Sequence, residues 1–281
     1  MGSSYSSSRA NSASNSTSSQ AVSSILTLLI IAALIVFFQF IYYIFTSKSL
    51  NFVTLLDKTV MSDANMITIS QNPNNVDSIP IGISVNERTG IEFAYSFYIF
   101  VNQSTFDGMD RLKHIFHKGY NSPWPLMGPG VFMLGTTNTM RVIMNTQTSP
   151  FTYVDVTNIP VGKWVHVVLN CYKSGLDVYI NGNLATRLPL TGNMPYQNFQ
   201  NIVIFSPSNR RFSSTVTNSL PFDINFGGPI SGQLSELKYA RYALSINEIN
   251  SLMAGGPSKV VAVSNSEKPP YNADTWWTDQ H

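Results

Sequence analysis

Residues 162–182, with the sequence GKWVHVVLNCYKSGLDVYING, carry the strongest local structural signal in the chain. From Trp164 to Tyr172 most residues are β-branched or aromatic, as in a β-strand. Residues 173–175 provide a short turn, and Asn181 with Gly182 supplies the two positive φ angles of a type I′ hairpin turn. The stretch therefore predicts two successive β-hairpins.

Residues 164–172 are expected to form a central strand of a sheet. Successive side chains of a strand point to opposite faces, so the residues divide into two sets. One face carries Val165, Val167, Leu169 and Cys171, and the other carries Trp164, His166, Val168 and Asn170. Both sets contain bulky groups, so both faces should be covered. Cys171 is the lone cysteine, which excludes an internal disulfide and favours a small buried side chain.

Short strand candidates continue on both sides of these hairpins. They are residues 66–70, 79–85, 91–101, 114–118, 131–135, 140–145, 152–156, 164–172, 176–180, 184–188, 201–205 and 232–239. Parallel neighbours would need crossover helices, so the pattern predicts an antiparallel sandwich or barrel.

One short helix is expected near the C-terminus. Ser245 and Glu248 have the spacing of a capping box, and Leu244 and Ile249 stand at the hydrophobic staple positions. Residues 255–257, Gly-Gly-Pro, should end this helix.

The order and spacing of these segments resemble the laminin G-like and pentraxin-like jelly rolls of the concanavalin A-like lectin/glucanase family. The matching segments are 90–99, 114–119, 162–168, 175–182, 232–239 and 243–249, so the resemblance covers about residues 65–256. It implies an all-β fold, an antiparallel two-sheet jelly-roll sandwich with one short C-terminal helix. Such folds mostly bind carbohydrates or proteins, and some are catalytic.

Residues 25–45, ILTLLIIAALIVFFQFIYYIF, contain no charge. At about 1.5 Å per residue this length matches a hydrocarbon core of about 30 Å, and we expect a transmembrane helix over 25–46. A cleaved signal peptide is the alternative, but the run is long and only Arg9 precedes it. Lys48 and Lys58 on the other side leave the orientation undecided.

The expected organisation has five parts. They are a disordered Ser/Asn-rich tail over 1–24, the transmembrane helix over 25–46, a connector over 47–64, the sandwich over 65–256 and an extended tail over 257–281. Charged residues make up 11% of the chain and the net charge is +2, which disfavours nucleic-acid binding and suits a protein held at a bilayer or within an assembly.

No catalytic residues are expected. A glycosidase needs two carboxyl groups close together, and the glutamates are scattered at Glu87, Glu92, Glu236, Glu248 and Glu267.

Metal binding is not expected at the histidines. Three positions apart on a strand, His114 and His117 should point to opposite faces and could not share an ion. His166 is expected to be structural. Calcium stays an open alternative, because oxygen donors occur in several loops without a calcium-binding signature, at Asp107, Asp110, Asp155, Asp223 and Asn225.

Three groups of residues are candidates for binding a ligand or partner. Trp124, in the loop 120–130, is either an exposed recognition group or a plug at the edge of the sandwich. Arg210 and Arg211, in the insertion 207–228, could contact a partner. Trp276 and Trp277, in the C-terminal tail, should dock on this domain or on another protein.

These features favour a membrane-anchored, non-enzymatic interaction or structural module. The organisation is similar in style to membrane-anchored structural proteins of large DNA viruses, in which such a domain could link an internal virion membrane to a capsid layer. The alternative is a membrane-anchored lectin-like attachment protein that binds glycans.

Overall fold

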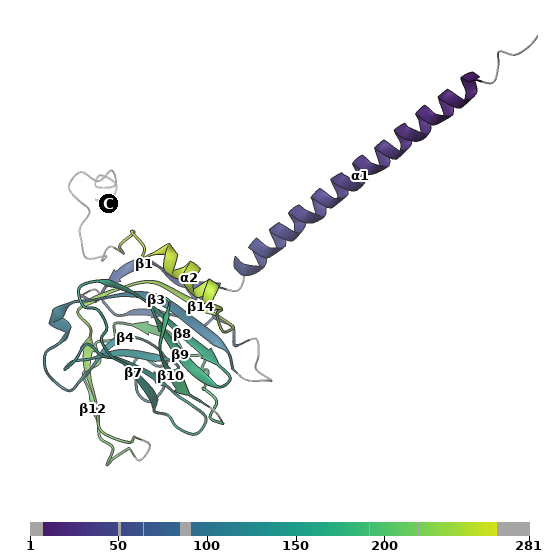
Figure 1. Ribbon diagram of the computed structural model, residues 1–281. Coiled ribbons are helices and arrows are strands. Elements are labelled where there is room, and N and C mark those ends of the chain that lie inside the picture. The colour runs from purple at the N-terminus through teal and green to yellow at the C-terminus, as the bar shows by residue number, and fades with distance from the viewer. Residues whose placement is uncertain are drawn as a thin grey trace, which may run out of the picture. The chain divides into compact units, whose positions relative to one another are not determined.

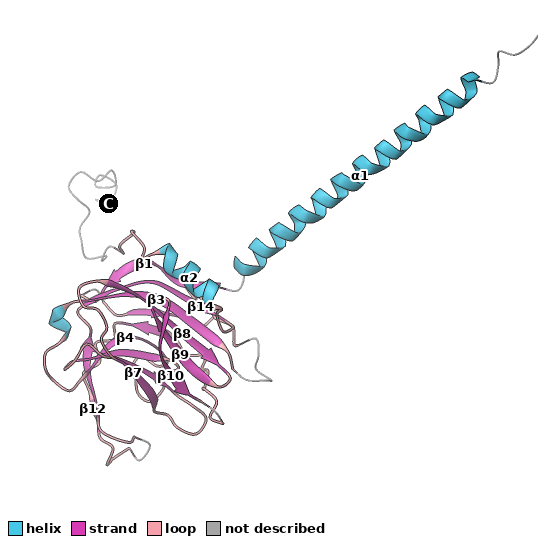
Figure 2. Ribbon diagram, viewed as in Figure 1, coloured by secondary structure: helices cyan, strands magenta, loops and turns pink. Residues whose placement is uncertain are grey.

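The computed structural model describes residues 8–49, 52–63, 65–84, 91–190, 192–217 and 220–262. The chain divides into two units, residues 1–51 and 52–281. Figure 1 labels their elements and Figure 2 colours them by type.

The first unit is a single helix, α1, from Ser8 to Ser49. Within it Val22–Tyr42, 21 residues, is long and apolar enough to cross a membrane, and none of this span is buried in the protein. A signal sequence near an N-terminus has the same features. The disorder expected over 1–24 stays a prediction, and the structure has residues 8–24 in the same helix. No Gly or Pro interrupts that stretch, so the helix of the apolar segment extends through it one hydrogen bond at a time.

The second unit is a β-sandwich. Its strands are β1 (Phe52–Met61), β2 (Ile67–Ile69), β3 (Phe93–Val101), β4 (Leu112–Lys118), β5 (Gly130–Leu134), β6 (Met140–Met144), β7 (Thr152–Val156), β8 (Trp164–Tyr172), β9 (Gly175–Ile180), β10 (Asn183–Pro189), β11 (Ile202–Ile204), β12 (Arg211–Phe212), β13 (Ile224–Pro229) and β14 (Gly232–Ala240). A 3-10 turn, η1 (Gln103–Thr105), and the helix α2 (Ile246–Gly255) complete it.

The strands form two sheets, as the sequence predicts. The first has the order β1-β14-β3-β8-β9-β10, and the second has the order β12-β13-β4-β5-β6-β7, with β11 also on β4 and β2 on β11. The pairings are antiparallel except for β13 with β4. The main core lies between the sheets and includes Phe97, Ile99 and Phe116.

The central hairpins form as expected. Val165, Val167, Leu169 and Cys171 point into the main core, while Val168, on the other face, packs with Leu244 and Ile249 beside α2. Asn181 and Gly182 have φ angles of 48° and 79°, as a type I′ turn requires. Ser245 and Glu248 form the capping box of α2.

The expected connector over 47–64 is wrong in part, because β1 occupies residues 52–61 and pairs with β14. Register shifts next to Leu56 break the regular alternation along β1, which hides the strand in the sequence. The expected strand over 79–85 is absent from its described part, 79–84. There Ile81 N–H donates to the side chain of Gln71 instead of to a neighbouring strand. The short strands β12 and β13 were not expected.

The chain enters the sandwich at one end of β1 and its described part finishes beside the other end. After α2, residues 258–262 run along β1. Thr59 N–H donates to the carbonyl of Val260 at 2.8 Å, and Ala262 N–H donates to the carbonyl of Thr59 at 2.8 Å. Phe52 and Ala262 therefore lie towards opposite ends of this edge strand. Of the tail expected over 257–281, residues 263–281 lie outside the described residues.

Candidate functional site

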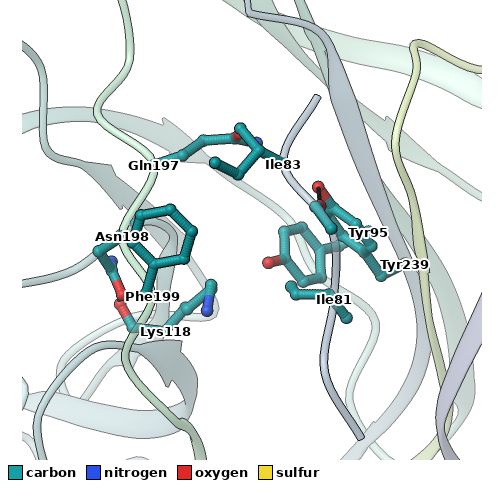
Figure 3. A pocket seen from close by; sticks show the side chains of 10 residues that line it. Ile81, Ile83, Tyr95, Lys118, Gln197, Asn198, Phe199 and Tyr239 are labelled. Carbon is teal, nitrogen blue, oxygen red and sulfur yellow. Dashed lines mark hydrogen bonds between the residues drawn. The ribbon is translucent and has the colours of Figure 1, made fainter. Parts of the chain in front are cut away.

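A small pocket opens at one end of the sandwich, where β3 begins and β4 and β14 finish (Figure 3). We call it the lysine pocket. It is lined by Ile81, Gly82, Ile83, Tyr95, Lys118, Gly128, Gln197, Asn198, Phe199 and Tyr239. Its cavity of about 20 Å³ has room for about one water molecule.

Lys118 is the last residue of β4 and is only 4% exposed. It follows the pleat of Phe116, so its side chain turns towards the space between the sheets. Its Nζ donates to the carbonyl of Gln200 at 2.6 Å, and no carboxylate among the described residues pairs with it. Burial lowers the pKa of the Lys118 ammonium to about 8. The pocket therefore holds a buried cation whose charge the described residues leave unbalanced.

Tyr95 and Tyr239 face Lys118 and Phe199 across the pocket (Figure 3). The two tyrosine rings lie 5.0 Å apart, and Tyr239 Oη donates to the carbonyl of Gly82 at 2.9 Å. Burial raises the pKa of both phenols, that of Tyr239 to about 12. Both side chains therefore stay neutral near pH 7.

The rim of the lysine pocket is formed by the loop before β11. The ring of Phe199 is 71% exposed, and Tyr196 is exposed beside it in the sequence. Gln197 Oε1 accepts a hydrogen bond from Ser84 N–H, and Asn198 Nδ2 donates to the carbonyl of Lys118 at 3.0 Å. These bonds tie the rim to β4 and to the segment around Ile83, and they leave the Phe199 ring to solvent.

Trp124, predicted as either a recognition group or a plug, is a plug. It is 8% exposed and packs against Phe151 and Phe212, with ring centroids 6.4 and 6.1 Å apart. We call its surroundings the outer cluster, which lies on the face of the second sheet turned away from the main core. Its members are Leu112, Trp124, Met127, Phe132, Ile143, Phe151, Leu220, Ile224 and Phe226.

The insertion 207–228 folds over the same outer cluster through Leu220 and Phe226. Arg210 and Arg211 are exposed on it, and Arg211 forms an ion pair with Asp223 at 2.7 Å. Neither arginine lines the lysine pocket. Trp276 and Trp277 lie outside the described residues.

The expectation that His114 and His117 point to opposite faces is wrong. A bulge in the pairing of β4 with β5 lies between His114 and Phe116, and Ile115 and Phe116 both enter the main core. Both histidines consequently turn outward, and His114 Nε2 lies 2.7 Å from His117 Nδ1.

The two imidazoles form a hydrogen-bonded chain with fixed ends. Ser206 N–H donates to His114 Nδ1 at 2.9 Å, so His114 carries its proton on Nε2 and donates it to His117. His117 Nε2–H donates in turn to the carbonyl of Tyr120 at 2.6 Å. Every ring nitrogen is engaged. Burial lowers the pKa of both rings, that of His117 to about 4, so the pair is neutral.

Other chemically notable side chains also have partners, although in the described part of the structure the buried Nδ1 of His166 has no hydrogen bond. His166 Nε2 lies 2.9 Å from Ser96 Oγ beneath the first sheet's outer face, and burial lowers the pKa of its ring to about 4. Two of the oxygen donors named for calcium, Asp107 and Asp155, pair with Lys113 and Arg141. Within the described ranges, no three His, Cys, Asp or Glu side chains gather as a metal site would require.

A second pocket of about 260 Å³ lies beside β6, β7 and β13. We call it the arginine pocket. Arg141 makes a bidentate pair with Asp155 at 2.7 Å for each bond and lies 4.3 Å from the centre of the Tyr153 ring. The lining residues are Asp110, Arg111, Leu112, Arg141, Tyr153, Phe222, Asp223, Ile224 and Asn225. It therefore combines two carboxylates, two guanidinium groups and two aromatic rings.

Neither pocket was predicted from the sequence, because each combines residues from several distant segments. A local signal for Lys118 did exist. It is a lysine at the end of a strand whose neighbours are apolar or aromatic, which is unusual for a buried position.

The fold defines a jelly-roll sandwich of the kind found in lectin-like binding domains. The chain belongs to the concanavalin A-like lectin/glucanases superfamily, whose laminin G-type family matches residues 84–250. A search of curated proteins gives no match.

Three solved structures illustrate the similarity in fold. The binding domain of Paraclostridial Mosquitocidal Protein 1 is 14% identical over 73% of this chain and 52% of its own, with a TM-score of 0.46. The receptor binding domain of botulinum neurotoxin mosaic serotype C/D is 13% identical over 73% and 45%, with a TM-score of 0.46. Trypanosoma rangeli sialidase is 13% identical over 58% and 22%, with a TM-score of 0.37. This chain thus spans about half the length of the first two.

Proposed function

We propose that this chain is a non-enzymatic binding module that is anchored in a membrane by α1 and contacts a partner protein through its sandwich. The observation that carries this proposal is the succession of an uncharged 21-residue span, Val22–Tyr42, and a superfamily sandwich whose first strand begins soon afterwards at Phe52. A span of this length matches the bilayer core. The sandwich is then tethered to the lipid surface by a short stretch of chain.

The positions at which the chain enters and leaves the sandwich support a linking role. Phe52, nearest in sequence to the anchor, and Ala262, nearest to the C-terminal tail, lie towards opposite ends of β1. A tail that leaves the far end could reach a partner on the side away from the tether. The most specific version of the proposal is that this partner belongs to a capsid layer around an internal viral membrane. This version rests on similarity of organisation alone.

A binding role is also supported by how the described carboxylates are used. Glu236 pairs with Lys238 at 2.8 Å, and Glu248 caps α2 and accepts from the hydroxyl of Tyr242. These glutamates are therefore engaged in structural contacts, which is unlike the free carboxyl pair of a glycosidase.

Flotation of the full-length chain with vesicles tests the anchor, together with N-terminal sequencing of the mature protein. We expect the intact chain to float with lipid, and a variant lacking residues 22–42 to stay in the soluble fraction. Cleavage after the apolar segment would identify it as a signal sequence and would overturn the anchor. Crosslinking of the membrane-bound chain in its native assembly, with and without residues 263–281, then tests the partner contact.

A second candidate function, glycan binding, is favoured by the arginine pocket. Its two carboxylates and two guanidinium groups balance, so a neutral ligand rich in hydroxyl groups suits it better than an ion. Phe222, which is 36% exposed, offers an aromatic surface to the apolar side of a sugar. A glycan array on the full-length protein tests this. Specific binding that Phe222→Ala removes and Phe199→Ala keeps would favour the lectin function over the protein-binding one.

A further inference from the structure

The lysine pocket has a property that the architecture of the sandwich does not require. A buried ammonium group is costly unless it is paired, and Lys118 has one hydrogen bond, to the carbonyl of Gln200. An ammonium has three donors, and the described residues leave two of them without a protein partner. Replacement of this lysine by an apolar residue would fill the same space without burying a charge. The pocket therefore contains a buried cation that has no anionic partner among the described residues.

We propose that the lysine pocket receives the carboxylate of a glutamate or aspartate side chain from an acidic segment of a partner protein. The carboxylate would accept hydrogen bonds from Lys118 Nζ and lie near the hydroxyls of Tyr95 and Tyr239. This inference names the contact through which the proposed binding module recognises its partner, so it rests on the proposed function.

The size of the cavity selects the form of the carboxylate. About 20 Å³ accommodates a group no larger than about one water molecule. A carboxylate is larger than one water molecule, so one of its oxygens would enter the cavity while its carbon and stem stay at the rim. A flexible, narrow methylene stem allows this approach, and a pyranose ring attached directly to the carboxylate hinders it. The pocket therefore distinguishes an acidic side chain from a sugar acid.

The rim fits a peptide on either side of that carboxylate. The exposed ring of Phe199 and the partly exposed Ile81 and Ile83 provide an apolar border. Exposed aromatic groups on loops are frequent energetic centres of protein interfaces. We expect an acidic residue with apolar neighbours to bind best, with its stem packed against the Phe199 ring.

The low pKa of Lys118, which burial causes, provides a second readout of binding. A bound carboxylate favours the charged ammonium, so binding should raise the pKa of Lys118 above about 8 and weaken as pH rises beyond it. Among the described residues that line the pocket, the other titratable groups are the Tyr95 and Tyr239 phenols, which stay neutral over that range because burial raises the pKa of both.

The test uses the full-length chain in phosphatidylcholine nanodiscs and three small probes at equal ionic strength. The probes are N-acetyl-glutamate methylamide, its glutamine analogue and glucuronate. At ten times its Kd, the glutamate probe should raise the Tm of the sandwich by about 3–6 °C. The glutamine and glucuronate probes should leave the Tm unchanged.

Variants assign the effect to the pocket. Lys118→Met should remove the stabilisation by the glutamate probe, and Phe199→Ala should reduce it. Lys163→Met removes an exposed lysine elsewhere and should keep the full shift. The proposal is wrong if the glutamate probe leaves wild-type Tm unchanged up to its solubility limit, stabilises Lys118→Met equally, or acts no better than glucuronate.

One further variant tests whether the carboxylate comes from this chain. Glu87 belongs to residues 85–90, which lie outside the described residues and follow the segment that lines the pocket. If Glu87→Gln lowers the Tm of wild type but not that of Lys118→Met, Glu87 is the partner of Lys118 and the proposal is overturned. Membrane flotation of Lys118→Met should equal that of wild type, so failure of the pocket is distinguishable from failure of the anchor.

Discussion

His114 and His117 share a hydrogen bond of 2.7 Å between Nε2 of the first ring and Nδ1 of the second, on the outer face of β4. Because Ser206 N–H and the carbonyl of Tyr120 fix the two ends of this chain, both rings must be neutral for all the bonds to form. Protonation of either ring would place two donors against each other.

This arrangement predicts loss of stability in mild acid. The folded pKa of His117 is about 4, below the unfolded value of 6.5, and burial lowers those of His114 and His166 as well. The unfolded state therefore binds more protons, and stability falls as pH decreases from about 6.5 to about 4. For His117 alone the loss is on the order of 3 kcal/mol. Urea denaturation at a series of pH values measures it.

The carboxylates act in a different pH range, which provides the control. The Arg211 guanidinium lowers the pKa of Asp223 to about 2, so its contribution is lost only below about pH 4. His117→Gln should reduce the proton uptake on unfolding between pH 6.5 and 4 by about one proton. An unchanged uptake would mean that His117 is accessible to protons in the folded state.

Lys118→Met should not destabilise the protein at pH 7. The folded pKa of Lys118 is about 8 and the unfolded value is 10.5, so wild-type stability should rise as pH increases from about 8. The difference in free energy of unfolding between Lys118→Met and wild type isolates this effect and should shrink over that range. Above about pH 10 the tyrosines reverse the trend, because burial raises their folded pKa and the unfolded phenols ionise first. A constant difference would show that Lys118 is solvated.

Trp124→Ala should destabilise the sandwich by about 3–5 kcal/mol, because it empties a large volume in the outer cluster. Phe199→Ala removes an aromatic ring that is 71% exposed and should change stability by less than about 1 kcal/mol. Chemical denaturation of both variants measures this contrast. Equal stabilities would mean that the loop 120–130 does not plug the outer face in solution.

Thr59→Val should release the segment after α2. Thr59 Oγ1 lies 2.9 Å from Ser235 Oγ and donates to the carbonyl of Ser258 at 2.7 Å, and both contacts are buried or partly buried. Loss of the hydroxyl should cost about 1 kcal/mol, because Ser235 Oγ, which accepts from Ser258 N–H, then loses a neighbour. Limited proteolysis should cut sooner within residues 256–262 than in wild type, whereas Thr148→Val, at an exposed loop, should cut at the wild-type rate.

The parts of the fold predicted from sequence are those that depend on neighbouring residues. Asn181 and Gly182 specify their turn through backbone conformation, and Ser245 with Glu248 specifies the start of α2, so both were predicted correctly. β1 was missed because its register shifts disturb the alternation on which strand prediction depends. The direction of His114 and His117 was wrong for the same reason, since one bulged residue reverses the face of every following side chain.

The binding sites depend on contacts between distant residues, which local patterns do not contain. For Trp124, the sequence left the plug and the recognition group equally open, and packing against Phe212, 88 residues later, decided for the plug. The lysine pocket brings Lys118 next to Phe199 and Tyr239, and no spacing in the sequence indicates that proximity.

The opposite placement of Phe52 and Ala262 on β1 also has a mechanical consequence. If the anchor and the tail are pulled apart, tension acts along the axis of β1, parallel to the strand. The two hydrogen bonds that join Thr59 to residues 260 and 262 then carry the load together in shear and cannot be peeled away one at a time. A module joined to its surroundings in this way resists rupture far better than one pulled from two chain ends on the same side.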